Sequence, residues 1–504
     1  MIMQLLKRIA IFSLWSVCVL SLSITKTYAS TVTISQTGSV VTATNGMLTI
    51  TYDLSIGKGN CSAGSTSIIS NFYSDYGVSG SSTRISSYDS GTRTASWVSI
   101  GTDGYGSSGK KLTITNSLTS GSTIILNLTL YSDKPFALAS MTVNKGTSQT
   151  LNFLEAIAAQ NLDIGTGSDK RIYTTPYNNN YDFGVAPVND FGNSENQVDR
   201  TSTTTTTWSA FDGTSFWVAV MFDNTNKQGF IAGAATTVNW KSYQYLHPAT
   251  TANGALTGFS VFNSGGTQSG TSVSSDLFFL GYYSDYRDGL VQFGNAYSVG
   301  QPKLAWSGGV PLGYNDYYTF YADPTVTAMN SMTDYFVAHL KSLGYTYMNL
   351  DCCYKGTSPA TASDYQTYTN YVHGKGMKAG SYSAPFEIFD PLTNPVPGAT
   401  SYTFQDLALK DSTGAVILSY LGKPIVDTTH PAAQPYLQNL LNTYYVNTGM
   451  DYIKLDFLDL AMYEGAHHDS TKNGMQAYRI GDLPAGSRAS YQVASNLNFF
   501  GVAT

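Results

Sequence analysis

The hydrophobic period of the chain changes near Tyr283, and this change limits what each half can fold into. Before it, short runs are rich in β-branched residues or alternate apolar with polar residues, and Gly, Asn and Ser separate them. Runs such as MLTITYDL, KKLTITNSL and STIILNLTLYS are typical of antiparallel strands. After it, helix-like stripes alternate with short apolar runs. The sequence therefore predicts an all-β part followed by an α/β part.

Residues 30–282 are numerous enough for one large antiparallel β-sandwich. Residues 283–306 form a connection, in which the apolar stripe of residues 284–298 predicts a helix. In residues 307–504, predicted helices at 325–343, 363–374 and 431–447 precede predicted strands at 345–351, 378–383 and 452–457. This repeat predicts the parallel sheet of a (β/α)8 TIM-type barrel.

The first 29 residues resemble an export signal. Lys7 and Arg8 precede an apolar stretch, and small residues at Thr27 and Ala29 suit cleavage before Ser30. We therefore predict a signal peptide at residues 1–29 and a secreted protein, either extracellular or periplasmic. The alternative is an uncleaved membrane anchor, since the apolar stretch approaches the length of a span.

Removal of this segment leaves Cys61, Cys352 and Cys353, an odd and sparse set that is not a disulfide framework. The six histidines are scattered and add no zinc-ligand spacing. We therefore expect neither a structural metal nor a cofactor. Charged residues make up only 12% of the chain and the net charge is -6, so nucleic acid is not the expected partner.

One polar pair ends an otherwise apolar predicted strand, in the segment DYIKLDFL. Lys454 and Asp456 are two positions apart and therefore leave the strand on the same face. At the C-terminal end of a barrel strand, a carboxylate beside an ammonium can act as a nucleophile. An isolated pair of this kind is also a common structural ion pair. Here the other predicted strand ends are polar too, at Asn315 and Asp316, Asp351 and Tyr382, which indicates one shared pocket.

The order of four segments resembles a known group of enzymes. GYNDYY at Gly313, GYTYMNLDCCY at Gly344, YVHGKGMKAGSYS at Tyr371 and TGMDYIKLDFL at Thr448 are similar to clan D glycoside hydrolases, the α-galactosidases of families 27 and 36. The stretch PIVDTTHPAAQPYLQNLL from Pro424 is closer to family 36, as is a β-sandwich placed before the barrel. The resemblance covers roughly residues 283–478.

This resemblance implies a retaining mechanism in which Asp456 is the catalytic nucleophile. Lys454 would hydrogen-bond a sugar hydroxyl and keep Asp456 ionised. Asp351 matches the first residue of an Asp-Asp pair that binds sugar hydroxyls. The second position holds Cys352, and a thiol is a poor acceptor, so the preference for galactose is open.

The resemblance also implies that Tyr314, Asn315 and Tyr382 line the sugar site. Tyr314 stands where the family often has tryptophan, and Asn315 keeps a polar group. Tyr382 is equally compatible with a place in the core. Asp316 and Glu387 lie in predicted loops, and we assign neither a direct catalytic role.

A retaining glycosidase needs a second carboxyl group, which in this family follows the sixth strand. A barrel uses about 30 residues for each βα unit, and only 48 residues follow Asp456. We therefore expect an incomplete barrel whose general acid lies beyond residue 504, in a longer enzyme. The final segment either ends aberrantly or hides a fifth strand in SYQVASNLNFF.

The sequence thus predicts a secreted glycosidase that cleaves terminal α-galactosides, or a related α-linked sugar, from oligosaccharides or polysaccharides. The alternative is a non-catalytic secreted protein that binds carbohydrate or mediates adhesion. A third reading is a glycosidase of another clan with calcium ligands further along the chain.

Overall fold

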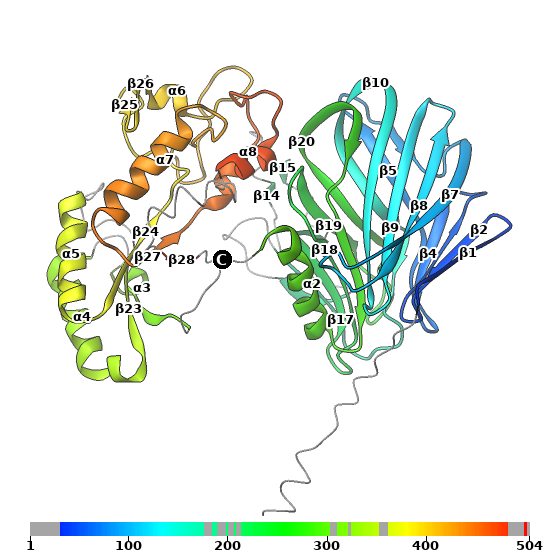
Figure 1. The fold of residues 1–504 in the computed structure, drawn as a ribbon, viewed down its shortest axis with the longest axis horizontal. Coiled ribbons are helices and arrows are strands. Elements are labelled where there is room, and N and C mark those ends of the chain that lie inside the picture. The colour runs from blue at the N-terminus through cyan, green and yellow to red at the C-terminus, as the bar shows by residue number, and fades with distance from the viewer. Residues whose placement is uncertain are drawn as a thin grey trace, which may run out of the picture.

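A computed structural model describes residues 31–175, 184–188, 198–199, 206–207, 213–302, 310–320, 324–351, 361–481 and 498–500. The predicted signal peptide, Cys352 and Cys353 lie outside these ranges. Two parts are visible in Figure 1, a large body of strands and a smaller body in which helices flank a sheet. None of the helices in the described ranges is long and apolar enough to span a membrane.

The N-terminal part is antiparallel throughout its described strands, as the sequence predicted. Nineteen of its strands are linked by hydrogen bonds, and two short ones pair with each other. The strands are β1 (Thr33–Thr37), β2 (Val40–Thr44), β3 (Thr49–Asp53), β4 (Lys58–Ala63), β5 (Thr66–Val78), β6 (Arg84–Ser86), β7 (Gly91–Ile100), β8 (Gly109–Leu118), β9 (Ser122–Tyr131), β10 (Phe136–Ala159), β11 (Asn161–Leu162), β12 (Lys170–Thr174), β13 (Gly184–Pro187), β14 (Val198–Asp199), β15 (Thr206–Thr207), β16 (Gly213–Phe216), β17 (Val218–Asp223), β18 (Gly229–Ala234), β19 (Lys241–His247), β20 (Gly258–Ser274) and β21 (Phe278–Tyr283).

Alternation of buried and partly exposed residues sets the register of these strands. In β9, every second residue from Ile124 to Leu130 is buried. Leu128 faces Leu112 of β8 in the ladder, so both side chains enter the same core. The linked strands form two sheets that face each other across this core. Strand β5 pairs with β4 in one sheet and with β10 in the other, and it thereby joins them.

Helix α2 (Tyr286–Gly300) covers the outer face of this body, close to the predicted residues 284–298. Asp285 caps its first turn by accepting a hydrogen bond from the Arg287 amide. A Cβ atom at Gly289 would lie 2.2 Å from Ile231 of β18, so only glycine allows the helix to approach the sheet this closely.

The C-terminal part is built on a parallel sheet in the order β22 (Leu312–Asn315), β23 (Tyr345–Leu350), β24 (Lys378–Ser383), β27 (Tyr452–Leu455) and β28 (Asn498–Phe500). The three predicted strands coincide with β23, β24 and β27, and the hidden fifth strand is β28, which pairs in parallel with β27. Within the described ranges the sheet is open, so the structure shows five parallel strands and not a closed barrel.

Helices pack on one side of this sheet, at the left of Figure 1. Met329 and Phe336 of α4, Tyr368 of α5 and Leu441 of α7 join Met348 of β23 in one core. The helical elements are α3 (Tyr317–Phe320), α4 (Val326–His339), η1 (Lys341–Leu343), α5 (Ala362–Gly374), α7 (Ala433–Leu441), the π-turn η3 (Asn442–Val446), the 3₁₀ turn η4 (Leu458–Met462) and α8 (Gly474–Gly481).

A segment between β24 and α7 forms a small core of its own that the sequence did not predict. It contains β25 (Pro395–Val396), β26 (Ala399–Thr403) and α6 (Phe404–Leu407). Phe386, Leu407 and Ile425 are buried there against Leu460, which belongs to the turn after β27. This segment therefore lies beside the C-terminal ends of the central parallel strands.

Candidate active site

Three charged side chains meet at the C-terminal edge of the parallel sheet. Lys454 Nζ donates to Asp351 Oδ2 at 2.7 Å, and its distance to Asp456 Oδ2 is 3.7 Å. The Lys454 ammonium also lies 5.2 Å from the centre of the Tyr382 ring. These four residues come from the ends of β23, β24 and β27, which are neighbours in the sheet. The structure thus brings together four of the seven residues that the sequence predicted.

The burial of the three charged groups differs. The side chain of Asp351 is 3% exposed, whereas those of Lys454 and Asp456 are 24% and 19% exposed. Asp351 is therefore the inner partner of the ammonium, and Asp456 lies closer to solvent.

The backbone around Asp456 is held in an unusual conformation. The Asp456 amide donates to Ser383 O at 2.9 Å, so the ladder continues one residue beyond β27. Phe457 then adopts a left-handed φ of 53°, and its amide donates to Asp456 Oδ1 at 2.9 Å. Left-handed backbone is uncommon for a bulky residue and clusters at functional sites. This turn leaves Asp456 Oδ2 on the side of Lys454.

A third carboxyl group, Asp316, lies directly behind Asp351. Asp316 is fully buried, and its Oδ1 accepts a hydrogen bond from the Asp351 amide at 2.5 Å. Burial is the main cause that raises the pKa of Asp316 to about 7, and the charge of Asp351 adds to it. From the sequence, Asp316 is one of the polar residues at strand ends that indicate a shared pocket, with no direct catalytic role assigned to it.

The two predicted residues on β22 take different positions. Tyr314 pairs in register with Met348, which belongs to the helix-side core, and its ring lies 5.4 Å from Phe336 of α4. The expectation that Tyr314 lines the sugar site is therefore corrected, because this side chain faces the helices. Asn315 lies on the face that carries Lys454, is exposed, and accepts a hydrogen bond from the Tyr317 amide at 3.1 Å. Cys352 lies outside the described residues.

Glu387 is a buried carboxyl group next to this cluster. Its Oε1 accepts a hydrogen bond from Ser419 Oγ at 2.6 Å. Burial raises its pKa, and the negative charge of Asp456 contributes in the same direction. The charge of Asp456 is thus close enough to raise the pKa of Glu387, which belongs to the segment between β24 and α7.

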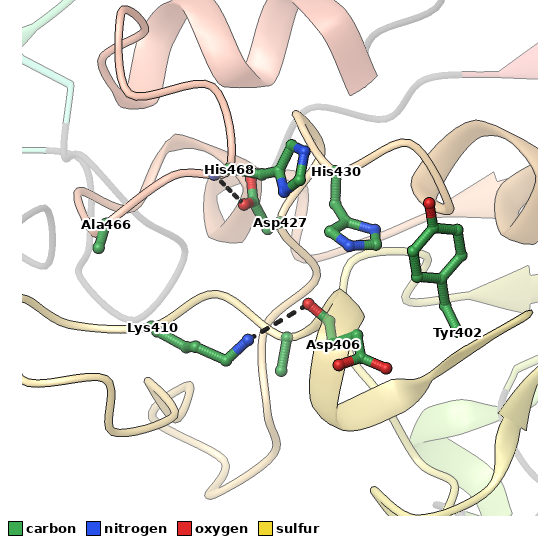
Figure 2. A pocket seen from close by; sticks show the side chains of 8 residues that line it. Tyr402, Asp406, Lys410, Asp427, His430, Ala466 and His468 are labelled. Carbon is green, nitrogen blue, oxygen red and sulfur yellow. Dashed lines mark hydrogen bonds between the residues drawn. The ribbon is translucent and has the colours of Figure 1, made fainter.

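A separate cavity of about 330 Å³ lies between that segment and the loop after η4 (Figure 2). The His430 and His468 rings meet there with centres 4.8 Å apart. Asp427 accepts hydrogen bonds from the His468 amide at 2.7 Å and from the buried His467 ring at 3.2 Å, so this carboxylate is structural. The cavity is lined by Tyr402, Asp406, Ala408, Lys410, Asp427, His430, Ala466 and His468.

None of these lining residues belongs to the cluster around Lys454. Across the described ranges, no group of three or more His, Cys, Asp or Glu side chains is arranged to hold a metal ion. The chemistry that the Lys454 cluster can perform with its own groups is that of a carboxylate nucleophile beside a cation.

Comparison with known proteins shows that the chain is similar to one group of enzymes, although no family model matches the sequence. The chain is 28% identical over 136 residues to α-galactosidase 2 of Arabidopsis thaliana, covering 24% of this chain and 34% of that protein. It is 27% identical over 120 residues to α-galactosidase A of Cellvibrio japonicus, covering 22% and 29%. The alignments thus span about a third of the length of these curated relatives.

Solved structures match over nearly the whole chain. The family 36 α-galactosidase AgaB of Geobacillus stearothermophilus superposes with a TM-score of 0.55 at 11% identity, covering 93% of this chain and 72% of that one. The α-galactosidase of Lactobacillus brevis gives 0.54 at 12% identity, with coverage of 94% and 70%. The α-N-acetylgalactosaminidase NagBb of Bifidobacterium bifidum gives 0.54 at 10%, with coverage of 91% and 76%. The chain is therefore α-galactosidase-like in its fold and, over about a quarter of its length, in its sequence.

Proposed function

We propose that this chain is a secreted, retaining glycoside hydrolase that acts on terminal α-galactosides or a related α-linked sugar. The observation that carries the proposal is the position of the Lys454 ammonium between the Asp351 and Asp456 carboxylates at the C-terminal edge of a parallel sheet. The curated relatives with similar sequences are α-galactosidases, which supports this choice of substrate class.

In the proposed mechanism, an Asp456 oxygen attacks the anomeric carbon while the bond from that carbon to the leaving oxygen breaks. The leaving oxygen takes a proton from a general acid, and a covalent glycosyl-enzyme remains. Water then attacks the same carbon and gives a proton to the deprotonated general acid, while the bond from that carbon to Asp456 breaks and the original configuration is restored. Lys454 and Asp351 bind hydroxyls of the sugar and hold it in line with the nucleophile.

The general acid is a second carboxyl group, which a retaining enzyme places about 5 to 5.5 Å from the nucleophile. We assign this role to no residue of the described ranges. The proposal therefore rests on the nucleophile half of the site, and its test must not depend on proton donation. A sugar with an activated leaving group meets this condition, because departure of that group needs no proton.

The test is covalent trapping with 5-fluoro-α-D-galactosyl fluoride, followed by mass spectrometry of the digested protein. The expected result is one added fluorosugar on the peptide that contains Asp456, and none in Asp456→Asn. Asp334→Asn is the matched control, because Asp334 lies in an exposed ion pair on the helix side. Labelling of another residue, or equal labelling of Asp456→Asn, would remove Asp456 as nucleophile.

A panel of aryl α-glycosides then identifies the sugar. Galactose, N-acetylgalactosamine and pentopyranose donors separate the related possibilities that Cys352 leaves open. If the protein binds sugars but neither cleaves an α-glycoside nor accepts the label, the non-catalytic carbohydrate-binding alternative replaces the proposal. Secretion has its own test, since the mature N-terminus recovered from the producing cell is expected to be Ser30.

A further inference from the structure

We propose that Asp316 is a positioning residue that fixes Asp351 from behind the site. This inference rests on the proposed function, in which Asp351 binds a sugar hydroxyl. Asp316 is completely covered, so it acts through Asp351 and not by touching substrate.

The geometry shows how the main chain of Asp351 is held. Strands β22 and β23 pair in parallel as far as Asn315 and Asn349. Beyond that point a side chain continues the ladder, because Asp316 Oδ1 accepts the hydrogen bond of the Asp351 amide at 2.5 Å. The Asp316 carbonyl in turn accepts bonds from the Thr319 and Phe320 amides, both at 2.9 Å, which anchor it to α3.

The other oxygen of Asp316 is unsatisfied. Oδ2 is buried and has no hydrogen-bond partner in the described part of the chain. An ionised carboxylate in such a place would lose its hydration without compensation, whereas a neutral acid loses much less. Asp316 therefore serves this position best as a carboxylic acid that accepts one hydrogen bond.

The protonation state of Asp316 also changes the electrostatic environment of the titratable residues that face it. These are Asp351 at the end of β23, Lys454 and the buried Tyr452 phenol on β27, and Tyr314 on β22 itself. With Asp316 neutral, the carboxylates of the described ranges that share the Lys454 ammonium are Asp351 and Asp456. With Asp316 ionised, a third negative charge competes for that cation. Burial raises the pKa of Asp316 to about 7, so sugar binding through Asp351 should weaken as pH rises through neutrality.

The test measures the affinity of the full chain for D-galactose by calorimetry between pH 5 and pH 9. Asp316→Asn keeps an acceptor for the Asp351 amide and cannot ionise, so its affinity should stay within about threefold of wild type at pH 6 and lose the weakening above pH 7. Asp316→Ala leaves that buried amide unsatisfied, and affinity should fall about five- to 150-fold at every pH. Asp334→Asn again serves as control.

Three results would overturn the inference: an Asn variant as weak as the Ala variant, an Ala variant with normal affinity, or a pH dependence that persists in the Asn variant. If the Ala variant does not fold, the Asn variant alone decides. If wild type binds no galactose at any pH, the proposed function fails separately. The inference is then decided by difference infrared spectroscopy, where a neutral carboxyl band that titrates near pH 7 must be absent from Asp316→Asn.

Discussion

The two parts of the molecule are joined by a buried charge whose removal should be measurable. Lys241, the first residue of β19, is completely buried, and its Nζ lies 2.6 Å from Oε1 of Glu464, which is 20% exposed. The Glu464 carboxylate also accepts the Gly474 amide at the start of α8, at 3.0 and 3.1 Å. Glu464 lies in the loop that begins at Asp456, so this contact ties the loop after the proposed nucleophile to the sandwich.

The expected loss of unfolding free energy depends on which of the two charged side chains remains buried after the substitution. Removing one member of a buried ion pair costs about 3–5 kcal/mol, because the other charge stays buried and unpaired. Glu464→Gln leaves the ammonium of Lys241 in that state and should cost about 3 kcal/mol. Lys241→Met leaves the Glu464 carboxylate, which stays partly hydrated and keeps its hydrogen bond from the Gly474 amide. A loss of about 2 kcal/mol is therefore expected. The double variant should cost about 2 kcal/mol, which is less than the two single changes together.

The assay is urea unfolding followed by tryptophan fluorescence, to which Trp240, buried next to Lys241, contributes. The control pair is Asp334 and Lys375, 2.6 Å apart and exposed, for which loss of either charge should leave the stability almost unchanged, because solvent screens such a pair. Hydrogen exchange of η4 should also accelerate in Glu464→Gln but not in the control. The reasoning is refuted if the single variants match the control, or if the double variant equals the sum of the single changes.

Three other predictions follow from the same contacts. The pKa of Asp316 is raised in the folded state from 3.8 to about 7, so its contribution to stability is complete at acidic pH and is lost as pH rises through this window. Relative to Asp316→Asn, wild type should lose about 3 kcal/mol between pH 5 and pH 8 in urea unfolding, and parallel curves would contradict this. Burial raises the pKa of Cys61 to about 12, so peptide mapping should find this thiol unlabelled by maleimide at pH 8 until urea unfolds the protein. Lys454→Met leaves Asp351 buried without its cation, and fluorosugar labelling of Asp456 should slow at least tenfold, which an unchanged rate would exclude.

The sequence predicted best those elements whose patterns are local. The strands β23, β24 and β27 each follow a predicted helix, and their predicted bounds differ from the observed ones by at most two residues, because the alternation of helix and strand is recorded locally in the sequence. Residues 384–432 carry no such period, since their core joins Phe386, Leu407 and Ile425 through isolated bridges and turns. Contacts between residues distant in sequence hold this segment together, and no short pattern records them.

The sequence also could not predict the orientation of Tyr314, because its strand β22 has only four residues. The register between β22 and β23 shifts at Leu312 and Gly313. Since a shift of one residue moves every side chain to the opposite face of a sheet, the sequence could not decide which face Tyr314 occupies.

Lys454 and Asp456 were predicted as a pair from their spacing. The shorter contact of Lys454 is with Asp351, 103 positions away, and only the order of the strands places the two together.

That difference in distance bears on the chemistry proposed for Asp456. A carboxylate that accepts a short hydrogen bond from a lysine has its lone pairs engaged and is a weaker nucleophile. Lys454 is bonded to Asp351 at 2.7 Å, whereas 3.7 Å separates it from Asp456 Oδ2, beyond hydrogen-bond reach. The Phe457 amide holds Asp456 Oδ1, which fixes the orientation of the carboxylate without occupying Oδ2. Lys454 thus directs one of its three N–H donors to Asp351, and Asp456 keeps an oxygen without a hydrogen bond from lysine beside a positive charge, as attack on an anomeric carbon requires.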